Sequence, residues 1–402
     1  MENAFYFVVD ENYLPMAAAQ AYILAGFNKF DVHVFVERNN KGIRLEDLVP
    51  DQILKSERIF YHLDKLECFL PEGLPESQKW PSIVYLRLFV PDLLKNYSRL
   101  VYLDADIAIA DDPTVLFDID IPTTIAAVHD YGILGETIVP FPGVEYTTDE
   151  WLGGIGLEGC RYFNSGVLLI NTERWSQLEI QRLLSKYFDQ FGHRVTMFDQ
   201  DFLNYTFKND WTELSPRWNF QTSLFDYGFE HEFKPVVVHF TAPLKPWNGD
   251  FYSYQQVYLS YFALLFKQLQ ITLPKPATRP RQRYIKRMKT AVRRLLLRLG
   301  IQFRRERVQR RIWGRYHGLA HDFLGDALEK GLFADFSEAP ILGEPKVFFD
   351  GHVVRTANLE DTLALLGPEL VLPRHSHSKE SRPFDKLAAA QSFREEEDHC
   401  EA

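Results

Sequence analysis

The stretch Leu100-Val101-Tyr102-Leu103-Asp104-Ala105-Asp106 places two carboxylates directly after four residues that suit a buried strand. A strand that stops at the edge of a sheet aims such a pair, spaced i, i+2, into the cleft beyond that edge. Carboxylate oxygens are preferred ligands of Mg²⁺ and Mn²⁺, and these cations keep positions open for phosphate oxygens. The stretch therefore predicts a metal site that grips the diphosphate of a nucleotide-sugar.

Apolar runs alternate with segments of helical periodicity on both sides of this stretch. This alternation predicts an α/β fold with a Rossmann-like, mostly parallel central sheet. Ligands of such sheets bind at the carboxyl ends of the strands, where Asp10, Asp104 and His239 each follow an apolar run. Strands are predicted over 5–9, 32–36, 58–63, 99–103, 124–128, 166–170 and 236–240, and helices over 15–27, 82–96, 172–191 and 199–207.

Composition narrows the class of protein. The 402 residues carry a formal net charge of −10, so no nucleic-acid partner is expected. Cys68, Cys160 and Cys400 are too far apart for a metal-ligand pattern and suit a reducing cytosol. The first residues lack the basic region of a signal peptide, and no run of about 18 apolar residues is present. We expect a cytoplasmic protein without a spanning helix.

The composition changes near Pro274. Residues 275–311 are dense in lysine and arginine, with Glu306 as their one acid, and apolar residues recur among them at helical spacing. This pattern predicts a basic amphipathic helix, within 275–316, that contacts an anionic membrane surface. A helix packed on the core with a solvated basic face, or a nucleic-acid contact, is the alternative.

The boundaries follow from these changes. We predict a catalytic domain over 1–270, the basic segment over 275–316, a small appendage of unknown role over 317–374 and a disordered tail over 375–402. Within the appendage, a hairpin is predicted at 347–354 and a short helix at 358–366.

His239 and Lys245 extend the metal motif. His239 ends an apolar run, and the turn that follows would carry Lys245 back towards the same cleft. One imidazole and two carboxylates suit Mn²⁺, with Mg²⁺ as the alternative, and a lysine neutralises a phosphate as a point charge. Each feature also has an ordinary explanation. His239 could be a core histidine, and the spacing Asp-x-Asp recurs at 118–120 and 199–201, where it could be a pair of solvated acids.

Five blocks resemble, in order and at matching spacing, glycosyltransferase family 8. This family of retaining enzymes includes bacterial lipopolysaccharide galactosyl- and glucosyltransferases and, more distantly, glycogenin. The resemblance covers roughly residues 3–270 and implies a GT-A fold, a Mn²⁺-dependent donor site and retention at the anomeric carbon. The blocks are 9–13, 85–88, 102–106, 162–171 and 239–247.

The resemblance also implies roles for single residues. Asp104, Asp106 and His239 would ligate the metal, and Lys245 would grip the diphosphate. Gln200 would lie on the β face of the sugar beside the anomeric carbon. The remaining donor contacts would be Asp10, Asn12 and Tyr13 at the uridine, Arg87, Asp130, Asn164 and Asp199 at the sugar, and Ala105 and Ala242, the last standing where the family commonly has glycine.

The expected function is transfer of galactose or glucose from UDP-galactose or UDP-glucose to a glycan or glycolipid such as lipopolysaccharide core. Because Gln200 is a poor nucleophile, front-face attack is favoured, with Asp199 or Asp201 left open as the nucleophile of a double displacement. A non-catalytic nucleotide-sugar-binding protein and a self-glycosylating protein remain alternatives. A haloacid-type phosphohydrolase is disfavoured, because Ala108 stands where that motif carries Thr or Val.

Overall fold

The computed structural model describes residues 2–37, 44–63, 70–74, 82–136, 147–208, 210–227, 229, 232–241, 245–248, 256–272, 288, 292 and 318–335. The hairpin expected at 347–354, the helix at 358–366 and the tail at 375–402 lie outside the described residues. So does the basic segment, apart from Met288 and Val292, which are both helical and exposed.

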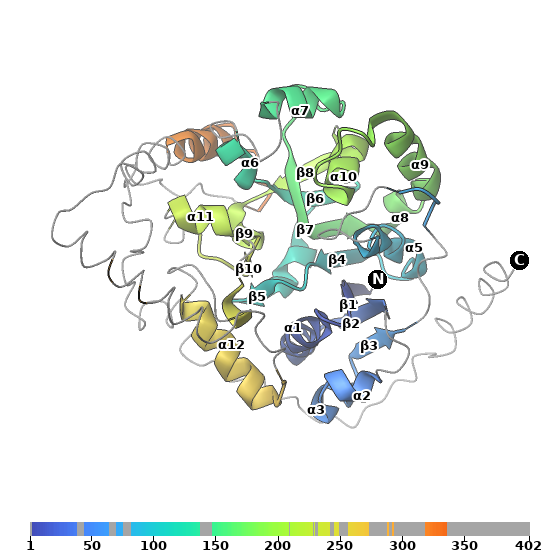
Figure 1. Cartoon of the computed structure of the whole chain (residues 1–402), viewed down its shortest axis with the longest axis vertical. Helices are drawn as coiled ribbons and strands as arrows, with labels where there is room; N and C mark the ends of the chain where they lie inside the picture. Colours follow the sequence, from blue (N-terminus) through green and yellow to red (C-terminus); the bar gives the residue numbers. More distant parts are fainter. Residues whose placement is uncertain are drawn as a thin grey trace, which may run out of the picture.

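A seven-stranded sheet forms the centre of the molecule, in the order β3-β2-β1-β4-β7-β6-β8 (Figure 1). Strand β7 runs antiparallel to β4 and β6, and the other neighbouring pairs are parallel. The predicted α/β fold with a mostly parallel sheet is therefore confirmed. The strands are β1 (Asn3–Asp10), β2 (Asp31–Glu37), β3 (Ile59–His62), β4 (Arg99–Leu103), β6 (Ile125–His129), β7 (Phe163–Asn171) and β8 (Trp211–Leu214).

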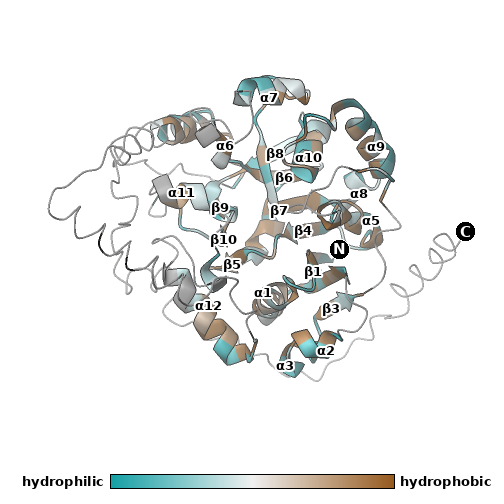
Figure 2. Cartoon of the chain, viewed as in Figure 1, coloured by the Kyte–Doolittle hydropathy of each residue, from teal (hydrophilic) through white to brown (hydrophobic). Residues whose placement is uncertain are grey.

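The central strands are apolar on both faces, as Figure 2 shows by their mostly brown colour. Strand β4 is buried along nearly its whole length, which explains its continuous apolar run. Helix α1 (Leu14–Gly26) covers one face with small side chains, and its Gln20 accepts a hydrogen bond from the backbone of Ile109 at 3.1 Å. That bond ties the helix to a second sheet.

The second sheet has three strands in the order β5-β10-β9, comprising β5 (Ile107–Ile109), β10 (Val237–His239) and β9 (Phe220–Gln221). We expected His239 to end a strand of the central sheet, and this was wrong. The chain leaves the central sheet at Leu103, crosses the acidic stretch and re-enters a ladder at Ile107, opposite His239. The acidic stretch therefore separates two sheets.

Two predicted helices are each broken in the structure. The segment 82–96 forms α4 (Ile83–Leu86) and α5 (Val90–Leu93), because Pro91 lacks the N–H that a continuous helix needs. The segment 172–191 forms α8 (Thr172–Trp175) and α9 (Ile180–Phe191). The remaining elements are α2 (Leu45–Leu48), α3 (Asp51–Leu54), α6 (Gly132–Glu136), α7 (Thr148–Gly154), α10 (Asp199–Phe207), α11 (Thr222–Tyr227), α12 (Gln256–Leu269) and the 3₁₀ turns η2 (Pro113–Asp118), η3 (Pro216–Trp218) and η4 (Pro246–Asn248).

A helix over 318–329, drawn in orange in Figure 1, lies beside α6. Its inner side is apolar and fully buried, with Ala320, Leu324 and Ala327 at 0% exposure. These residues therefore pack on the sheet domain although they follow it by more than forty positions in the sequence. Among the helices that the structure describes, none has the length and apolar character needed to cross a bilayer.

Candidate functional site

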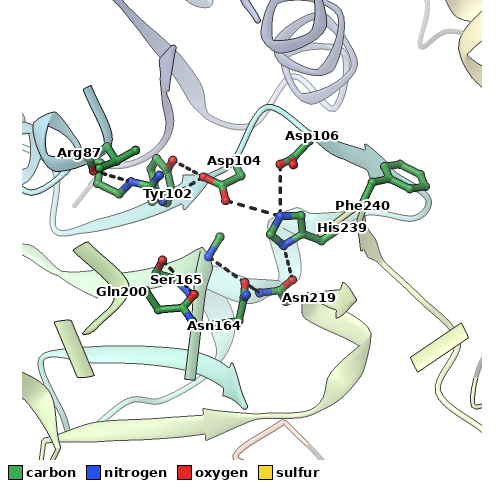
Figure 3. Close-up of polar contacts among 12 residues, drawn as sticks. Arg87, Tyr102, Asp104, Asp106, Asn164, Ser165, Gln200, Asn219, His239 and Phe240 are labelled. Carbon is green, nitrogen blue, oxygen red and sulfur yellow. Dashed lines mark hydrogen bonds and ion pairs between the residues drawn. The ribbon is translucent and has the colours of Figure 1, made fainter. Parts of the chain in front are cut away.

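Three side chains that suit a metal ion, Asp104, Asp106 and His239, meet where the chain passes from β4 to β5 (Figure 3). His239 Nε2 lies 3.5 Å from Asp104 Oδ2 and 3.2 Å from Asp106 Oδ1. One ligand atom of each residue lies within 4.8 Å of the others. The pairing of β5 with β10 explains this geometry, because His239 is in register with Ile107, the residue after Asp106. Such a donor set suits Mn²⁺ or Mg²⁺.

The ring of His239 is oriented by Asn219, which precedes β9. His239 Nδ1 lies 2.9 Å from Asn219 Oδ1, and Asn219 Nδ2 donates to Asn164 Oδ1 at 2.9 Å. Because the amide nitrogen of Asn219 is used in this way, its oxygen faces the ring and accepts the Nδ1 proton. The lone pair of Nε2 is left facing the two carboxylates, as a metal-binding imidazole requires.

Gly166 on β7 leaves room for these ligands. A Cβ at this position would lie 2.2 Å from His239 Cε1 and 2.7 Å from Asp104 Oδ2. The backbone of Gly166 also accepts a hydrogen bond from the N–H of Asp104 at 2.8 Å. Donor chemistry, imidazole tautomer and available space all fit a divalent cation bound between the three side chains.

Lys245 places a buried cation at the edge of the cluster. Its Nζ lies 2.6 Å from Asp106 Oδ2 and also donates to the carbonyl oxygen of Phe240. Burial alone would raise the pKa of the Asp106 carboxyl, but the charge of Lys245 holds that pKa well below its usual range. Asp106 is therefore ionised, and Lys245 adds a fixed positive charge for an anionic ligand.

Arg87, which follows α4, holds Asp104 through its other oxygen. The guanidinium lies 3.0 Å from Asp104 Oδ1 and 3.3 Å from Asp199 Oδ2, and it stacks 4.5 Å from the ring centre of Tyr102. The hydroxyl of Tyr102 donates to the same Oδ1 at 2.5 Å. Oδ1 is thus occupied by Arg87 and Tyr102, while Oδ2 faces His239.

A chain of hydrogen bonds connects this cluster to Gln200 at the start of α10. Asn164 Nδ2 donates to Asp130 Oδ2 at 3.2 Å, and Gln200 Nε2 donates to the same oxygen at 2.9 Å. Gln200 Oε1 in turn accepts from the backbone of Ser165 at 3.0 Å. Since Asn219 also donates to Asn164, the orientation of one amide depends on the next, from His239 to Gln200; Figure 3 shows the part from His239 to Asn164.

Asp201 is fully buried, and both of its carboxylate oxygens accept hydrogen bonds from other parts of the chain. Oδ2 accepts from the backbone of Thr196 and Met197 at 2.8 Å each, and Oδ1 accepts from the hydroxyl of Tyr162 at 2.6 Å. Burial raises the pKa of Asp201 to about 6 against the effect of these bonds. A carboxylate fixed in this way is poorly placed to attack a sugar.

Asp199 is also buried, beside Arg87. Burial raises the pKa of the Asp199 carboxyl to about 7, although the charge of Arg87 opposes the change. Asp199 is therefore partly protonated near neutral pH, and a protonated carboxyl donates a hydrogen bond more readily than it attacks a carbon atom.

The residue before Asp199 has a strained backbone. Phe198 has φ 48° and ψ −111°, a conformation that L-residues rarely adopt and that costs about 1–3 kcal/mol. We expect the free energy of unfolding of Phe198→Gly to exceed that of Phe198→Ala by about 1 kcal/mol. Both variants lose the ring, but only glycine relieves the backbone strain. Equilibrium urea unfolding of the two variants measures the difference. An alanine variant as stable as the glycine variant would contradict it.

The residues predicted for uridine lie at the last position of β1 and in the turn that follows it. Asp10 accepts hydrogen bonds from the backbone of Tyr13 at 2.9 Å and from Asn12 Nδ2 at 3.1 Å. Burial, followed by the charges of Asp106, Asp10 and Asp104, raises the pKa of Tyr13 to about 12. The turn therefore lies within electrostatic reach of the acidic cluster.

The structure thus brings those predicted donor and metal residues that it describes into one neighbourhood. Ala105 is buried between the two acids, and Ala242 lies outside the described residues. Asn219, Tyr102 and Gly166 complete the cluster but were not predicted as site residues. The one sequence signal for Asn219 is a polar residue between two aromatic ones, which is equally typical of a turn.

Comparisons with known proteins identify the family of this chain. The model of glycosyl transferase family 8 matches residues 5–250. General stress protein A of Bacillus subtilis is 31% identical over 214 residues, which span 48% of this chain and 68% of that protein. Lipopolysaccharide 1,2-glucosyltransferase of Escherichia coli K12 is 25% identical over 256 residues, spanning 60% of this chain and 71% of that protein.

Among solved structures, the galactosyltransferase LgtC in complex with donor and acceptor sugar analogs has a TM-score of 0.53 at 23% identity, covering 68% of this chain and 97% of that chain. This likeness shows a GT-A-like fold. Because the family model covers more than half of the sequence, the chain belongs to glycosyl transferase family 8.

Proposed function

We propose that this chain is a retaining hexosyltransferase that moves galactose or glucose from UDP-galactose or UDP-glucose to a glycan or glycolipid acceptor such as lipopolysaccharide core. The observation that carries the proposal is the meeting of Asp104, Asp106 and His239 beside the buried Lys245. Two carboxylates, one imidazole and one ammonium group form a site for a cation and a diphosphate together. We propose Mn²⁺ as the cation, with Mg²⁺ as the alternative.

The roles of the residues follow from their contacts. A bound divalent cation would stabilise the negative charge that grows on the departing UDP. Lys245 adds a second positive charge at the same place, and Arg87 and Tyr102 keep Asp104 in position. Asp130 and Asn164 face the donor sugar, while the turn holding Asp10, Asn12 and Tyr13 receives the uridine.

The surroundings of Gln200 favour front-face transfer. Its amide is held by Asp130 and Ser165, and an amide is a poor nucleophile. Asp199 is partly protonated near neutral pH and Asp201 is engaged by the backbone, so both neighbouring acids are weak candidates for a covalent intermediate. The acceptor hydroxyl would then pass its proton to the departing phosphate oxygen as it attacks.

A donor screen tests the proposal. Purified protein with Mn²⁺ is incubated with single nucleotide-sugars, and UDP release and the free sugar are measured without acceptor. We expect slow release from UDP-galactose or UDP-glucose, with the α-anomer formed first. Tight binding of the donor without release would instead indicate a binding protein. An increase in the protein's own mass by one hexose would indicate self-glycosylation.

We further propose that the protein attaches peripherally to the inner face of the cytoplasmic membrane. The density of lysine and arginine over 275–311 supports this, as do the exposed apolar side chains of Met288 and Val292, four positions apart. Sedimentation with phosphatidylglycerol vesicles tests it. The double variant Met288→Asp/Val292→Asp should lose most of the binding, and equal sedimentation of both proteins would reject the proposal.

A further inference from the structure

The segment 318–335 is fastened to the transferase domain at its carboxyl end. Asp335 Oδ1 accepts from the backbone of Ser215 at 2.7 Å, and Oδ2 accepts from Ser215 Oγ and from Trp218 Nε1 at 2.6 Å each. The backbone of Ala334 donates to the carbonyl of Glu213 at 3.0 Å. These contacts grip the turn η3, which leads directly into Asn219.

The chain reaches these partners because Gly331 reverses its direction just after the helix over 318–329. This residue has φ 59°, and the N–H of Leu332 donates to the carbonyl of Ala327 at 3.0 Å, which is the pattern of a left-handed helix cap. The reversal turns Phe333 into the core, 6.4 Å from the ring of Phe233, and brings Asp335 to η3. We call residues 318–335 the C-terminal clamp.

Phe323 of the clamp packs on both residues that flank Asp130. Its ring is stacked on His129, with centres 4.2 Å apart, and lies edge-on to Tyr131 at 6.0 Å. The guanidinium of Arg161 also contacts this ring, 4.2 Å from its centre. In Figure 1 the orange helix accordingly lies next to α6, which begins just after these residues.

The rings of His129 and Tyr131 depend on this packing. Both are buried, and neither the two ring nitrogens of His129 nor the hydroxyl of Tyr131 has a hydrogen-bond partner among the residues described. Their backbones, by contrast, are hydrogen-bonded to the side chain of Gln221, which donates to the carbonyl of His129 at 2.7 Å and accepts from the N–H of Tyr131 at 2.9 Å. Loss of Phe323 would remove a packing partner of both rings.

We propose that the C-terminal clamp, through Phe323, fixes the strand end 129–131 so that the carboxylate of Asp130 meets Gln200 and the donor sugar. Phe323 is then a positioning residue for the transfer step. The inference rests on the function proposed above, and the clamp lies outside the residues 5–250 matched by the family. It assigns a part in substrate recognition to a segment that follows the transferase domain.

The test compares full-length Phe323→Ala and Phe323→Tyr. We expect Phe323→Ala to lower kcat/KM for the UDP-hexose about tenfold, while the Kd of UDP with Mn²⁺ stays within about twofold, because UDP lacks the sugar that Asp130 would contact. Phe323→Tyr keeps the ring and should restore the wild-type value. Phe30→Ala, which removes another partly buried ring that packs on Phe117, is the control and should leave both quantities unchanged.

The experiment distinguishes failure of the proposed function from failure of the positioning role. If the wild-type protein releases UDP from no donor, the proposed function itself is wrong. If the wild-type protein is active and Phe323→Ala keeps its kcat/KM, or loses UDP affinity to the same extent, the positioning role is rejected. Should the alanine variant fail to fold, Phe323→Leu keeps the apolar volume without the stacked ring and answers the same question.

Discussion

Gly166→Ala should abolish Mn²⁺ binding and lower the rate of UDP release by at least about a hundredfold, although it adds one methyl group. The new Cβ would lie 2.2 Å from His239 Cε1 and 2.7 Å from Asp104 Oδ2, so one of the two ligands must move. His239 has little space to withdraw, since it is 3% exposed and its Nδ1 is held by Asn219. Isothermal titration with Mn²⁺ and UDP measures the effect.

The matched control is Gly153→Ala in α7, where the nearest atom to a new Cβ is 4.0 Å away. This variant adds the same methyl group inside a helix and should bind Mn²⁺ as the wild-type protein does. Circular dichroism of both variants separates loss of the site from loss of the fold. A folded Gly166→Ala protein with wild-type Mn²⁺ affinity would mean that the cation binds elsewhere.

Asp106→Asn should reduce kcat/KM by about a thousandfold. The change keeps the shape of the side chain but removes a negative ligand, and the charge stabilisation that a bound cation provides amounts to several kcal/mol. We expect Mn²⁺ affinity to fall by at least about a hundredfold in the same titration. Asp120→Asn, in the Asp-x-Asp pair at 118–120, alters a fully exposed carboxylate and should change neither quantity.

The variant Asp106→Asn also leaves Lys245 as a buried cation with a weaker partner, which destabilises the fold on its own. The double variant Asp106→Asn/Lys245→Met removes that charge and should recover most of the free energy of unfolding. It should recover none of the Mn²⁺ affinity. Recovery of both together would show that Asp106 stabilises Lys245 and takes no part in metal binding.

The sequence predicts the central sheet well because its strands are buried on both faces. Residues 100–103 and 5–9 form continuous apolar runs, which are typical of a core strand. Strand β8, with the sequence Trp-Thr-Glu-Leu, has no such run, and β9 has two residues. Both were missed because neighbouring strands, rather than their own residues, place them in a sheet.

In the candidate site too, some residues could be predicted from their own sequence context and others could not. Asp104 and His239 could be predicted as partners because each follows an apolar run and carries a metal-binding side chain, and Asp106 because it lies two positions after Asp104. Asn219 could not, because its importance comes from lying between His239 and Asn164, which are far from it in the sequence. Phe323 is a comparable case, since its partner His129 is nearly two hundred positions away.

The stretch between β4 and β5 belongs to neither sheet, and this has a consequence for the energetics of the whole molecule. Asp104 follows the central sheet, whereas His239 belongs to the smaller one. A cation bound by Asp104 and His239 together would connect the two sheets, so its binding energy would also stabilise their packing. At a free concentration a hundred times its Kd, such a cation adds about 2.7 kcal/mol to the free energy of unfolding. A bound divalent cation would then stabilise the fold as well as act as a Lewis acid in the proposed reaction.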